Sequence, residues 1–124
     1  MKSKYWADQI ADKLIKDRPK SKYVIASGIT PSGTIHFGNF REIITTDLIG
    51  RALLDKGKKV RFIYSWDDYD VFRKVPGNMP KKTILSKELG KPVSKVKNVF
   101  GSKYDSYATH LEAELEESVK LVGV

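Results

Sequence analysis

The feature that most constrains the fold is the stretch Ala26–Asn39, which reads ASGITPSGTIHFGN. A short apolar run beginning at Tyr23 leads into it, and an amphipathic segment leaves it from Phe40 onward. In α/β domains, phosphate sites are built where a strand breaks into Gly, Pro and small hydroxyl residues and restarts as a helix. Glycines let the backbone approach a ligand, and the helix N-terminus offers unpaired N–H groups and a positive dipole end. The sequence therefore predicts a phosphate-binding turn.

Strands and a helix are expected around this turn. Residues 23–27 form an apolar, partly β-branched run that predicts a buried strand, and residues 60–66 predict a second strand. The helix between them starts at Phe40, and Gly57 ends it as a C-cap. Strand, helix and strand in this order favour a right-handed βαβ unit with parallel strands. We therefore expect an α/β fold in which helices flank a parallel sheet.

Helical periodicity marks both ends of the chain. Residues 3–17 predict a docking helix that Ser3 caps, that Pro19 stops and that carries no chemistry. From Asp105 onward, apolar residues line one side of another predicted helix: Tyr107, Ala108, Leu111, Leu115, Val119 and Val122.

Composition limits the class of protein. At 124 residues the chain suits one domain with a single core, and its 40% apolar and 31% charged residues are typical of a globular protein. It has no cysteine, which excludes a disulfide framework and a thiolate zinc site. No apolar run approaches the length of a membrane span. We expect a cytoplasmic protein without a membrane partner.

Positive charge is concentrated in residues 71–103. This segment holds nine Lys and Arg residues and one acidic residue, Glu88, so its net charge equals the +8 of the whole chain. Prolines and glycines interrupt it, and it is expected to be an irregular insert with one short helix at residues 82–89. A polyanionic partner such as a nucleic acid would explain the charge, and a solvated lysine-rich surface is the alternative.

His36 stands at the turn into the predicted helix. A lone histidine at a helix start is more often structural than catalytic. Here it follows Pro31 and Ser32, and Gly38 beside it has no Cβ, so an adenine or ribose could lie against the backbone. His36 could donate hydrogen bonds to phosphate oxygens while charge builds during phosphoryl or nucleotidyl transfer.

An acidic cluster follows the second predicted strand. Asp67, Asp68 and Asp70 come directly after Trp66. Ligands of open parallel sheets bind beyond the carboxyl ends of the strands, so this cluster and residues 27–39 are expected at the same edge of the sheet. Turn formation at the strand end, or a metal site, would also explain the cluster, and Asp70 is expected to be a cap or loop residue.

The turn at His36–Asn39 resembles the HIGH signature of class I aminoacyl-tRNA synthetases, which lies at the same strand-to-helix turn of a Rossmann-like catalytic domain. Two longer stretches, residues 26–47 and 60–70, look like the archaeal-type class I lysyl-tRNA synthetases. Residues 72–76 and the helix at 107–117 are similar to that family too. The resemblance covers nearly the whole chain.

This resemblance implies a role for each residue of the turn. His36, Gly38 and Asn39 would be catalytic, because they would hold ATP and stabilise the transition state. Asn39 stands where the general signature has a second histidine, but this family commonly has Asn there, and its amide can still donate. Pro31 and Ser32 would shape the turn around the ATP phosphates.

The resemblance also implies a pocket for lysine. Lysine has two ammonium groups that need acceptors when they are desolvated. Ser27, Gly28 and Thr30 would line the pocket, and Asp67 and Asp68 would accept the α-ammonium group. Successive side chains on a strand point to opposite faces, so only one of the two aspartates is expected to face the lysine. Without the histidine beside them, the small residues would indicate only a turn.

The implied substrates are lysine, ATP and tRNA-Lys. Mg²⁺ would arrive mainly with the ATP phosphates, so no metal ligands are assigned in the protein. The basic segment at residues 71–103 would approach the acceptor end of tRNA-Lys. Its candidate phosphate contacts, which the sequence does not rank, are Lys74, Lys81, Lys82, Lys91 and Lys95.

The second signature of class I synthetases, the lysine-rich KMSKS loop, does not occur in these 124 residues. We therefore interpret residues 1–124 as a partial Rossmann-like (HUP-type) nucleotide-binding catalytic domain, the amino-terminal fragment of a lysine–tRNA ligase. Full two-step activity is not expected from it alone. The alternatives are a small nucleotidyltransferase of the H-x-G-H type and a non-catalytic fragment that binds nucleotide or tRNA.

Overall fold

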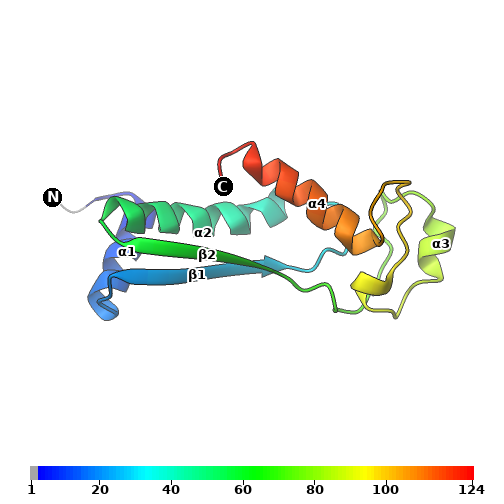
Figure 1. Ribbon diagram of the computed structural model, residues 1–124, viewed down its shortest axis with the longest axis horizontal. Helices are drawn as coiled ribbons and strands as arrows, with labels where there is room; N and C mark the ends of the chain where they lie inside the picture. The colour runs from blue at the N-terminus through cyan, green and yellow to red at the C-terminus, as the bar shows by residue number, and fades with distance from the viewer. Residues whose placement is uncertain (1–2) are drawn as a thin grey trace. The chain divides into compact units, whose positions relative to one another are not determined.

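The computed structural model describes residues 3–124, and its elements confirm the expected α/β fold. Strands β1 and β2 pair in a two-stranded sheet and run in the same direction (Figure 1). No helix in the described part of the chain is long and apolar enough to cross a membrane. The elements in chain order are α1 (Trp6–Asp17), β1 (Lys22–Ile29), α2 (Phe37–Asp55), β2 (Lys59–Trp66), α3 (Lys82–Ser86), the 3₁₀ turn η1 (Val93–Lys95) and α4 (Tyr107–Lys120).

The chain divides into two compact units, where the sequence suggests one domain. The helix–strand unit contains the described residues up to Gly28 together with Gly38–Ser65. The loop unit contains Ile29–Phe37 and Trp66–Val124.

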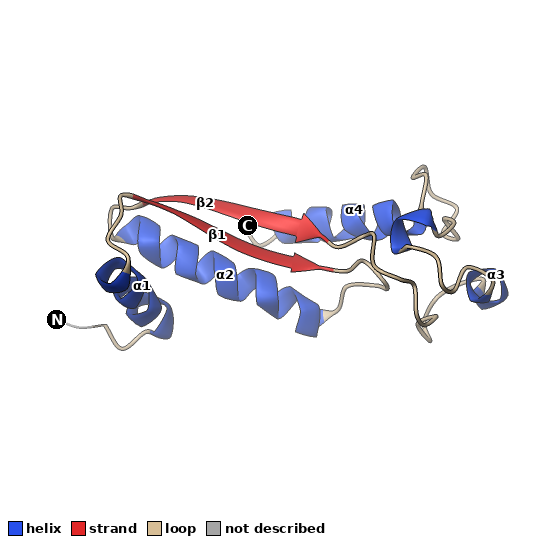
Figure 2. Ribbon diagram, turned by 90° about the horizontal axis from the view of Figure 1, so that it is seen from below, coloured by secondary structure: helices blue, strands red, loops and turns tan. Residues whose placement is uncertain are grey.

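Small side chains allow close packing in the helix–strand unit. Its core consists of Ala7 and Ala11 from α1, Tyr23 from β1, and Ala52 and Leu53 from α2. Helix α2 lies along one face of the two strands (Figure 2). A Cβ on Gly50 of α2 would come within 2.9 Å of Ile25 on β1, so glycine is needed for this approach.

The strands are longer and less buried than the sequence predicts. Strand β1 runs from Lys22 to Ile29, so Ser27 and Gly28 belong to the strand and not to the loop after it. Burial alternates along it: Tyr23 is 8% exposed and Val24 is 57% exposed. The prediction of a fully buried strand is therefore wrong, because one face of the sheet has no layer over it within this unit.

Helix α1 begins later than predicted. Its N-cap is Tyr5, and the cap makes no side-chain hydrogen bond. Ser3 lies outside the helix, where its Oγ accepts from the Tyr5 N–H at 3.1 Å and donates to Asp8 Oδ2 at 2.7 Å. The hydroxyl stabilises the turn before the helix, so the prediction of Ser3 as the cap is wrong. The predicted end before Pro19 is confirmed, since α1 ends at Asp17.

Helix α2 begins earlier than predicted and ends as predicted. It starts at Phe37 and not at Phe40, which places the predicted turn residues Gly38 and Asn39 inside its first turn. At its C-terminus Gly57 has φ +79°, and the N–H after it, from Lys58, donates to the Leu53 carbonyl at 3.0 Å. This is the αL termination that only glycine adopts readily.

The loop unit has a core of its own that the sequence analysis did not identify. Few residues of the basic segment are in helices, as expected, and α3 ends at Ser86 before the predicted Leu89. Its scattered apolar residues nevertheless pack together with the first turns of α4. The buried members are Phe72, Met79, Leu85, Val93, Val96, Val99, Tyr107, Ala108 and Leu111.

Helix α4 matches its prediction over its first three turns. Ser106 is the N-cap, and its Oγ accepts from the Thr109 N–H at 3.1 Å. Four predicted face residues are buried: Tyr107, Ala108, Leu111 and Leu115. Val122 lies beyond the end of the helix and is 53% exposed, so its predicted place on the apolar face is wrong.

Candidate functional site

The carboxyl ends of the two strands meet at one edge of the sheet. The Asp67 N–H, just after β2, donates to the carbonyl of Ile29, the last residue of β1, at 2.9 Å. Parallel pairing therefore brings the loop after β1 and the acidic cluster after β2 to the same edge, as the sequence predicts.

Ser27 and Gly28 lie near the end of β1 in the helix–strand unit. Ser27 Oγ donates to Glu42 Oε1 at 2.9 Å. A Cβ on Gly28 would lie 2.3 Å from Ser65 Oγ and 2.9 Å from the Ser65 carbonyl, so only glycine fits beside β2 here. Glu42 is not among the site residues predicted from the sequence. The sequence signal that could have indicated it is a carboxylate in the second turn of the helix that follows the phosphate-binding turn.

His36 directly precedes α2, and Gly38 and Asn39 lie in its first turn. The His36 side chain is exposed, Asn39 is half-buried, and Phe37 between them is 90% exposed. The aligned peptide dipoles of α2 give this end of the helix a partial positive charge. An imidazole and an amide beside this partial positive charge suit a ligand that carries negative charge.

Thr30, Pro31 and Ser32 continue from β1 in the loop unit. Pro31 is buried, and Thr30 Oγ1 donates to Asp70 Oδ2 at 2.8 Å. The Ser32 carbonyl accepts from the buried Tyr107 hydroxyl at 2.7 Å, which attaches this loop to α4. Asp70 is a loop residue, as predicted, but it also orients the Thr30 hydroxyl.

Asp67 and Asp68 differ in environment. The side chain of Asp67 is exposed, whereas Asp68 is half-buried and hydrogen-bonded to the side chain of Glu112 on α4. Burial is the largest cause that raises the pKa of the Glu112 carboxyl, and together with the negative charges of Asp68 and Glu116 it brings this pKa to about 7. A carboxyl group with a raised pKa thus lies beside the end of β2.

Comparison with known proteins identifies the family. A family model described as "tRNA synthetases class I (K)" matches residues 4–124. The chain belongs to this family. It is 52% identical over 124 residues to the "Lysine--tRNA ligase" of Treponema pallidum (strain Nichols), which covers 99% of the chain and 23% of that protein. It is 51% identical over 121 residues to the "Lysine--tRNA ligase" of Pyrococcus horikoshii, which covers 97% of the chain and 23% of that protein.

A third relative in this class I synthetase family is the "Lysine--tRNA ligase" of Borreliella burgdorferi, which is 53% identical over 125 residues. That match covers all of the chain and 24% of the relative. The chain thus spans about a quarter of the length of the curated relatives that it matches.

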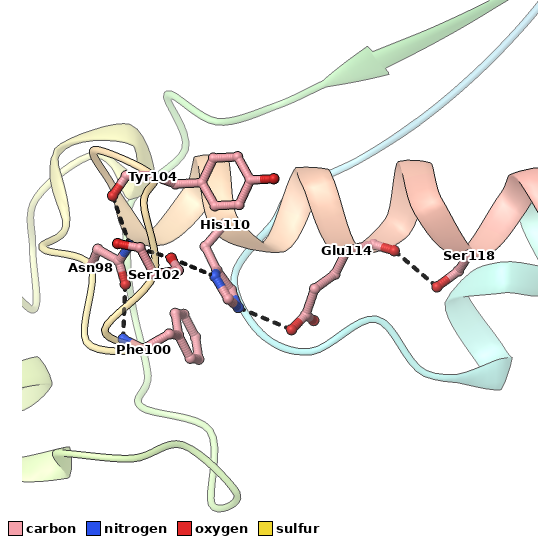
Figure 3. Close-up of polar contacts among 7 residues, drawn as sticks. All are labelled: Asn98, Phe100, Ser102, Tyr104, His110, Glu114 and Ser118. Carbon is pink, nitrogen blue, oxygen red and sulfur yellow. Dashed lines mark hydrogen bonds and ion pairs between the residues drawn. The ribbon is translucent and has the colours of Figure 1, made fainter.

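The second histidine of the chain, His110, has packing and hydrogen-bond contacts that indicate a structural role. His110 stacks on Phe100 with ring centroids 3.9 Å apart, and its two ring nitrogens lie 2.8 Å from Ser102 Oγ and 2.9 Å from Glu114 Oε1 (Figure 3). Asn98 holds the same loop from its other side by donating to Ser102 Oγ and to the Tyr104 carbonyl, each at 2.7 Å. This network fixes residues 98–104 against α4.

The basic residues at 71–103 differ in the contacts that they make. Glu88 is 3% exposed, and it forms ion pairs with Lys91 and, at 3.8 Å, with Lys97. Because its one carboxylate is buried, this segment presents mainly positive charge to solvent. The ion pair with Glu88 gives Lys91 a structural role, whereas Lys74 lines a cavity.

Among residues 3–124, the structure shows no group of three or more His, Cys, Asp or Glu side chains that could hold a metal ion. The side chains at and just after the ends of the two strands are hydroxyls and carboxylates. Such groups can bind an ammonium group by hydrogen bonds and charge.

Proposed function

We propose that the chain carries the ATP- and lysine-binding part of a lysine–tRNA ligase. The observation that carries this proposal is the family match over residues 4–124, which includes both the turn into α2 and the acidic end of β2. The curated relatives in Treponema and Pyrococcus are named lysine–tRNA ligases. In the proposed reaction, the lysine carboxylate attacks the α-phosphate of ATP to give lysyl-adenylate and pyrophosphate. A ribose hydroxyl of tRNA-Lys then attacks the carbonyl carbon of the adenylate, which forms lysyl-tRNA and releases AMP.

His36, Gly38 and Asn39 act on ATP in this proposal. His36 and Asn39 donate hydrogen bonds to phosphate oxygens as negative charge builds on them, and Gly38 leaves room for the nucleotide. Pro31 and Ser32 shape the turn around the phosphates. The position of His36 immediately before α2 supports these roles, because the positive end of the helix dipole favours the same charge.

Lysine is held by acceptors at the strand ends in this proposal. Ser27, Gly28 and Thr30 line its site, and Asp67 and Asp68 accept its α-ammonium group. Support comes from the Asp67–Ile29 backbone bond, which brings the acidic cluster to the end of β1. Catalysis would then rest on positioning and charge stabilisation, because the attacking carboxylate is already a nucleophile.

The remaining parts of the proposal concern Mg²⁺, tRNA and location. Mg²⁺ would be held mainly by ATP phosphates, as it usually is in sites with few protein ligands. The acceptor end of tRNA-Lys would contact the basic segment at residues 71–103. The cytoplasm stays the predicted location.

A chimeric enzyme tests this function. Because the chain is 52% identical to the Treponema pallidum ligase, it can replace the aligned segment of that enzyme. We expect the chimera to catalyse lysine-dependent ATP–pyrophosphate exchange. His36→Ala should lower the exchange rate by about 10²- to 10³-fold, the usual loss of one donor to a developing negative charge.

Thr34→Ala is the matched control, because Thr34 is an exposed residue of the same loop with no assigned role. It should leave the exchange rate unchanged. The proposal is wrong if the folded chimera shows no lysine-dependent exchange. It is also wrong if His36→Ala and Thr34→Ala behave alike.

A further inference from the structure

A cavity of about 250 Å³ lies in the loop unit. Loop residues after β1 form one wall and the segment after β2 forms the other. From the sequence, three of the lining residues, Thr30, Ser32 and Lys74, are predicted to bind substrates, whereas Asp70 and Arg73 have no predicted binding role. The cavity is lined by Thr30, Ser32, Asp70, Val71, Arg73 and Lys74.

Both walls are fixed to the core of the loop unit. On one side, Tyr107 donates to the Ser32 carbonyl at 2.7 Å. A Cβ on Gly33 would meet Pro76 at 2.9 Å, so the two walls touch closely there. On the other side, Val71 forms an antiparallel bridge with Pro92. The cavity therefore belongs to an ordered part of the unit and is preformed.

Its polar groups are of two kinds. Asp70 Oδ2 accepts from Thr30 Oγ1 at 2.8 Å, which orients the carboxylate and leaves its other oxygen as an acceptor. Arg73 and Lys74 are exposed, and no carboxylate in residues 3–124 lies within ion-pair distance of either. One hydroxyl acceptor next to two uncompensated cations matches a ligand that has hydroxyl groups beside a phosphate.

Size and charge favour a ribose phosphate over an amino acid. A free amino acid carries one carboxylate and would leave one of the two cations without a partner. A cavity of about 250 Å³ is smaller than the sites that enclose drug-sized ligands, so it suits a sugar phosphate and not a whole nucleotide.

We propose that Asp70, Arg73 and Lys74 bind the ribose phosphate of a nucleotide, with Asp70 accepting from a ribose hydroxyl and the two cations contacting the phosphate. The inference rests on the proposed function for the source of the nucleotide, which is ATP or the 3′-terminal nucleotide of an RNA. Asp70 is in addition a positioning residue for Thr30.

Calorimetric titration of the 124-residue chain with ATP, and with a short RNA that ends in CCA, tests the phosphate contact. We expect the double variant Arg73→Gln, Lys74→Gln to weaken binding of one of these ligands at least tenfold. The control is Lys16→Gln, Lys20→Gln, which removes the same charge from two exposed lysines that lie outside the basic segment at residues 71–103. It should change binding less than twofold.

Asp70→Asn tests the ribose contact. The wild-type chain should prefer the ribose form of the ligand over its 2′,3′-dideoxy form, because the dideoxy sugar cannot donate to the carboxylate. The variant keeps an acceptor oxygen for Thr30 but loses the charge. We expect its preference for ribose to fall about tenfold, while its affinity for the dideoxy ligand stays within twofold of wild type.

ATP and the RNA end give different binding results, and either result supports binding of a ribose phosphate. If ATP is the source, the double variant weakens ATP binding. If the RNA end is the source, it weakens RNA binding, and an RNA without its terminal adenosine no longer distinguishes the variant from wild type.

Three outcomes overturn the inference: unchanged affinity for both ligands, equal losses in the double variant and its control, or a loss of affinity for free lysine alone. The proposed function fails separately. A chimera without lysine-dependent exchange, in a chain whose nucleotide binding still needs Arg73 and Lys74, would reject the ligase and keep the nucleotide site. Normal lysine-dependent exchange with none of these binding effects would keep the ligase function and reject the nucleotide site.

Discussion

The two compact units bury their cores by different routes. In the helix–strand unit, alanines and one glycine allow regular elements to approach closely, as at Ala7, Ala11 and Gly50. In the loop unit, Phe72 and Tyr107 are fully buried although most residues between β2 and α4 lie outside helices and strands. Regular elements satisfy their own backbone groups, whereas an irregular chain must find tertiary partners for its backbone.

Particular side chains supply those partners in the loop unit. Asn98 closes its loop with bonds to the Tyr104 carbonyl and, through its Oδ1, from the Phe100 N–H at 2.8 Å. Tyr107 reaches the Ser32 carbonyl, and the buried Glu88 pairs with two lysines. The difference teaches that a few specific side-chain contacts stabilise the loop unit, so single substitutions there should have large and local effects.

Phe72→Ala should have the largest effect. Phe72 is fully buried and packs against the Tyr107 ring with centroids 5.4 Å apart. Removing the ring leaves a cavity and should lower the free energy of unfolding by about 4 kcal/mol. Chemical denaturation can follow each unit by fluorescence, because Trp6 lies in the helix–strand unit and Trp66 in the loop unit. In single-tryptophan backgrounds, the Trp66 transition should shift more than the Trp6 transition.

Leu89→Ala is the control for this substitution. Leu89 is in the same unit and 44% exposed, so its truncation should change stability by less than about 0.5 kcal/mol. Equal shifts of the two tryptophan transitions in Phe72→Ala would mean that the two units unfold together. The claim that substitutions in the loop unit act locally on its stability would then be wrong.

How much the sequence reveals follows the same division. Periodicity, Pro19 and Gly57 predict the helices and strands of the helix–strand unit, because those signals are local. The apolar residues of the core around Phe72 do not recur at the spacing of a helix or a strand, so periodicity does not predict this core. The predicted start of α2 at Phe40 is later than the observed start at Phe37. The reason is that Gly38 is a poor helix former, so the sequence pattern favours a turn at this position.

The candidate site shows the same limit. His36 and the acidic cluster could be found because each stands in a recognisable local pattern. The hydrogen bonds between Glu42 and Ser27 and between Asp70 and Thr30 could not be predicted, since the bonded residues lie 15 and 40 residues apart in the chain. Contacts of this range are set by the pairing of β1 with β2 and by the packing of α2, which no local pattern contains.

Glu88→Gln should have the next largest effect. The substitution keeps the shape but removes the buried charge that pairs with Lys91 and Lys97. We expect the free energy of unfolding to fall by about 2 kcal/mol, since the two ion pairs of a buried carboxylate are lost while the lysines can still reach water. The Trp66 transition should report the change in denaturation.

Asp17→Asn is the matched control for Glu88. It removes the carboxylate of an exposed ion pair with Lys13 in the helix–strand unit. Exposed pairs contribute little, so the unfolding midpoint should stay where it is. Similar losses in both variants would remove the claim that the loop unit depends on its single buried carboxylate.

Gly28→Ala tests the close packing of the helix–strand unit. The new methyl group would overlap Ser65, including its backbone carbonyl, so β1 and β2 must separate locally. We expect a loss of about 1.5 kcal/mol, typical of overpacking. Gly77→Ala is the control, because a Cβ there meets nothing within 4 Å. Thermal unfolding of both variants measures the difference, and equal midpoints would show that the strands do not need glycine at this contact.

Glu112→Gln should have the smallest effect, and its sign depends on pH. Burial, and after it the negative charge of Asp68, raise the pKa of Glu112 from 4.5 to about 7. Between these two values the folded chain holds more protons than the unfolded chain, so this carboxyl makes stability fall as pH rises from 4.5 to 7. The glutamine cannot ionise, so the variant should lose that fall and exceed wild type above pH 7 by about 1 kcal/mol, after allowance for solvent screening.

Denaturation at pH 5 and pH 8 measures this difference. Glu117→Gln on the same helix is the control, because Glu117 is exposed and should leave the pH dependence unchanged. The Trp66 transition should carry the pH effect and the Trp6 transition should not, since Glu112 and Asp68 both lie in the loop unit. A pH dependence that survives in Glu112→Gln would mean that groups other than the Glu112 carboxyl titrate in this range.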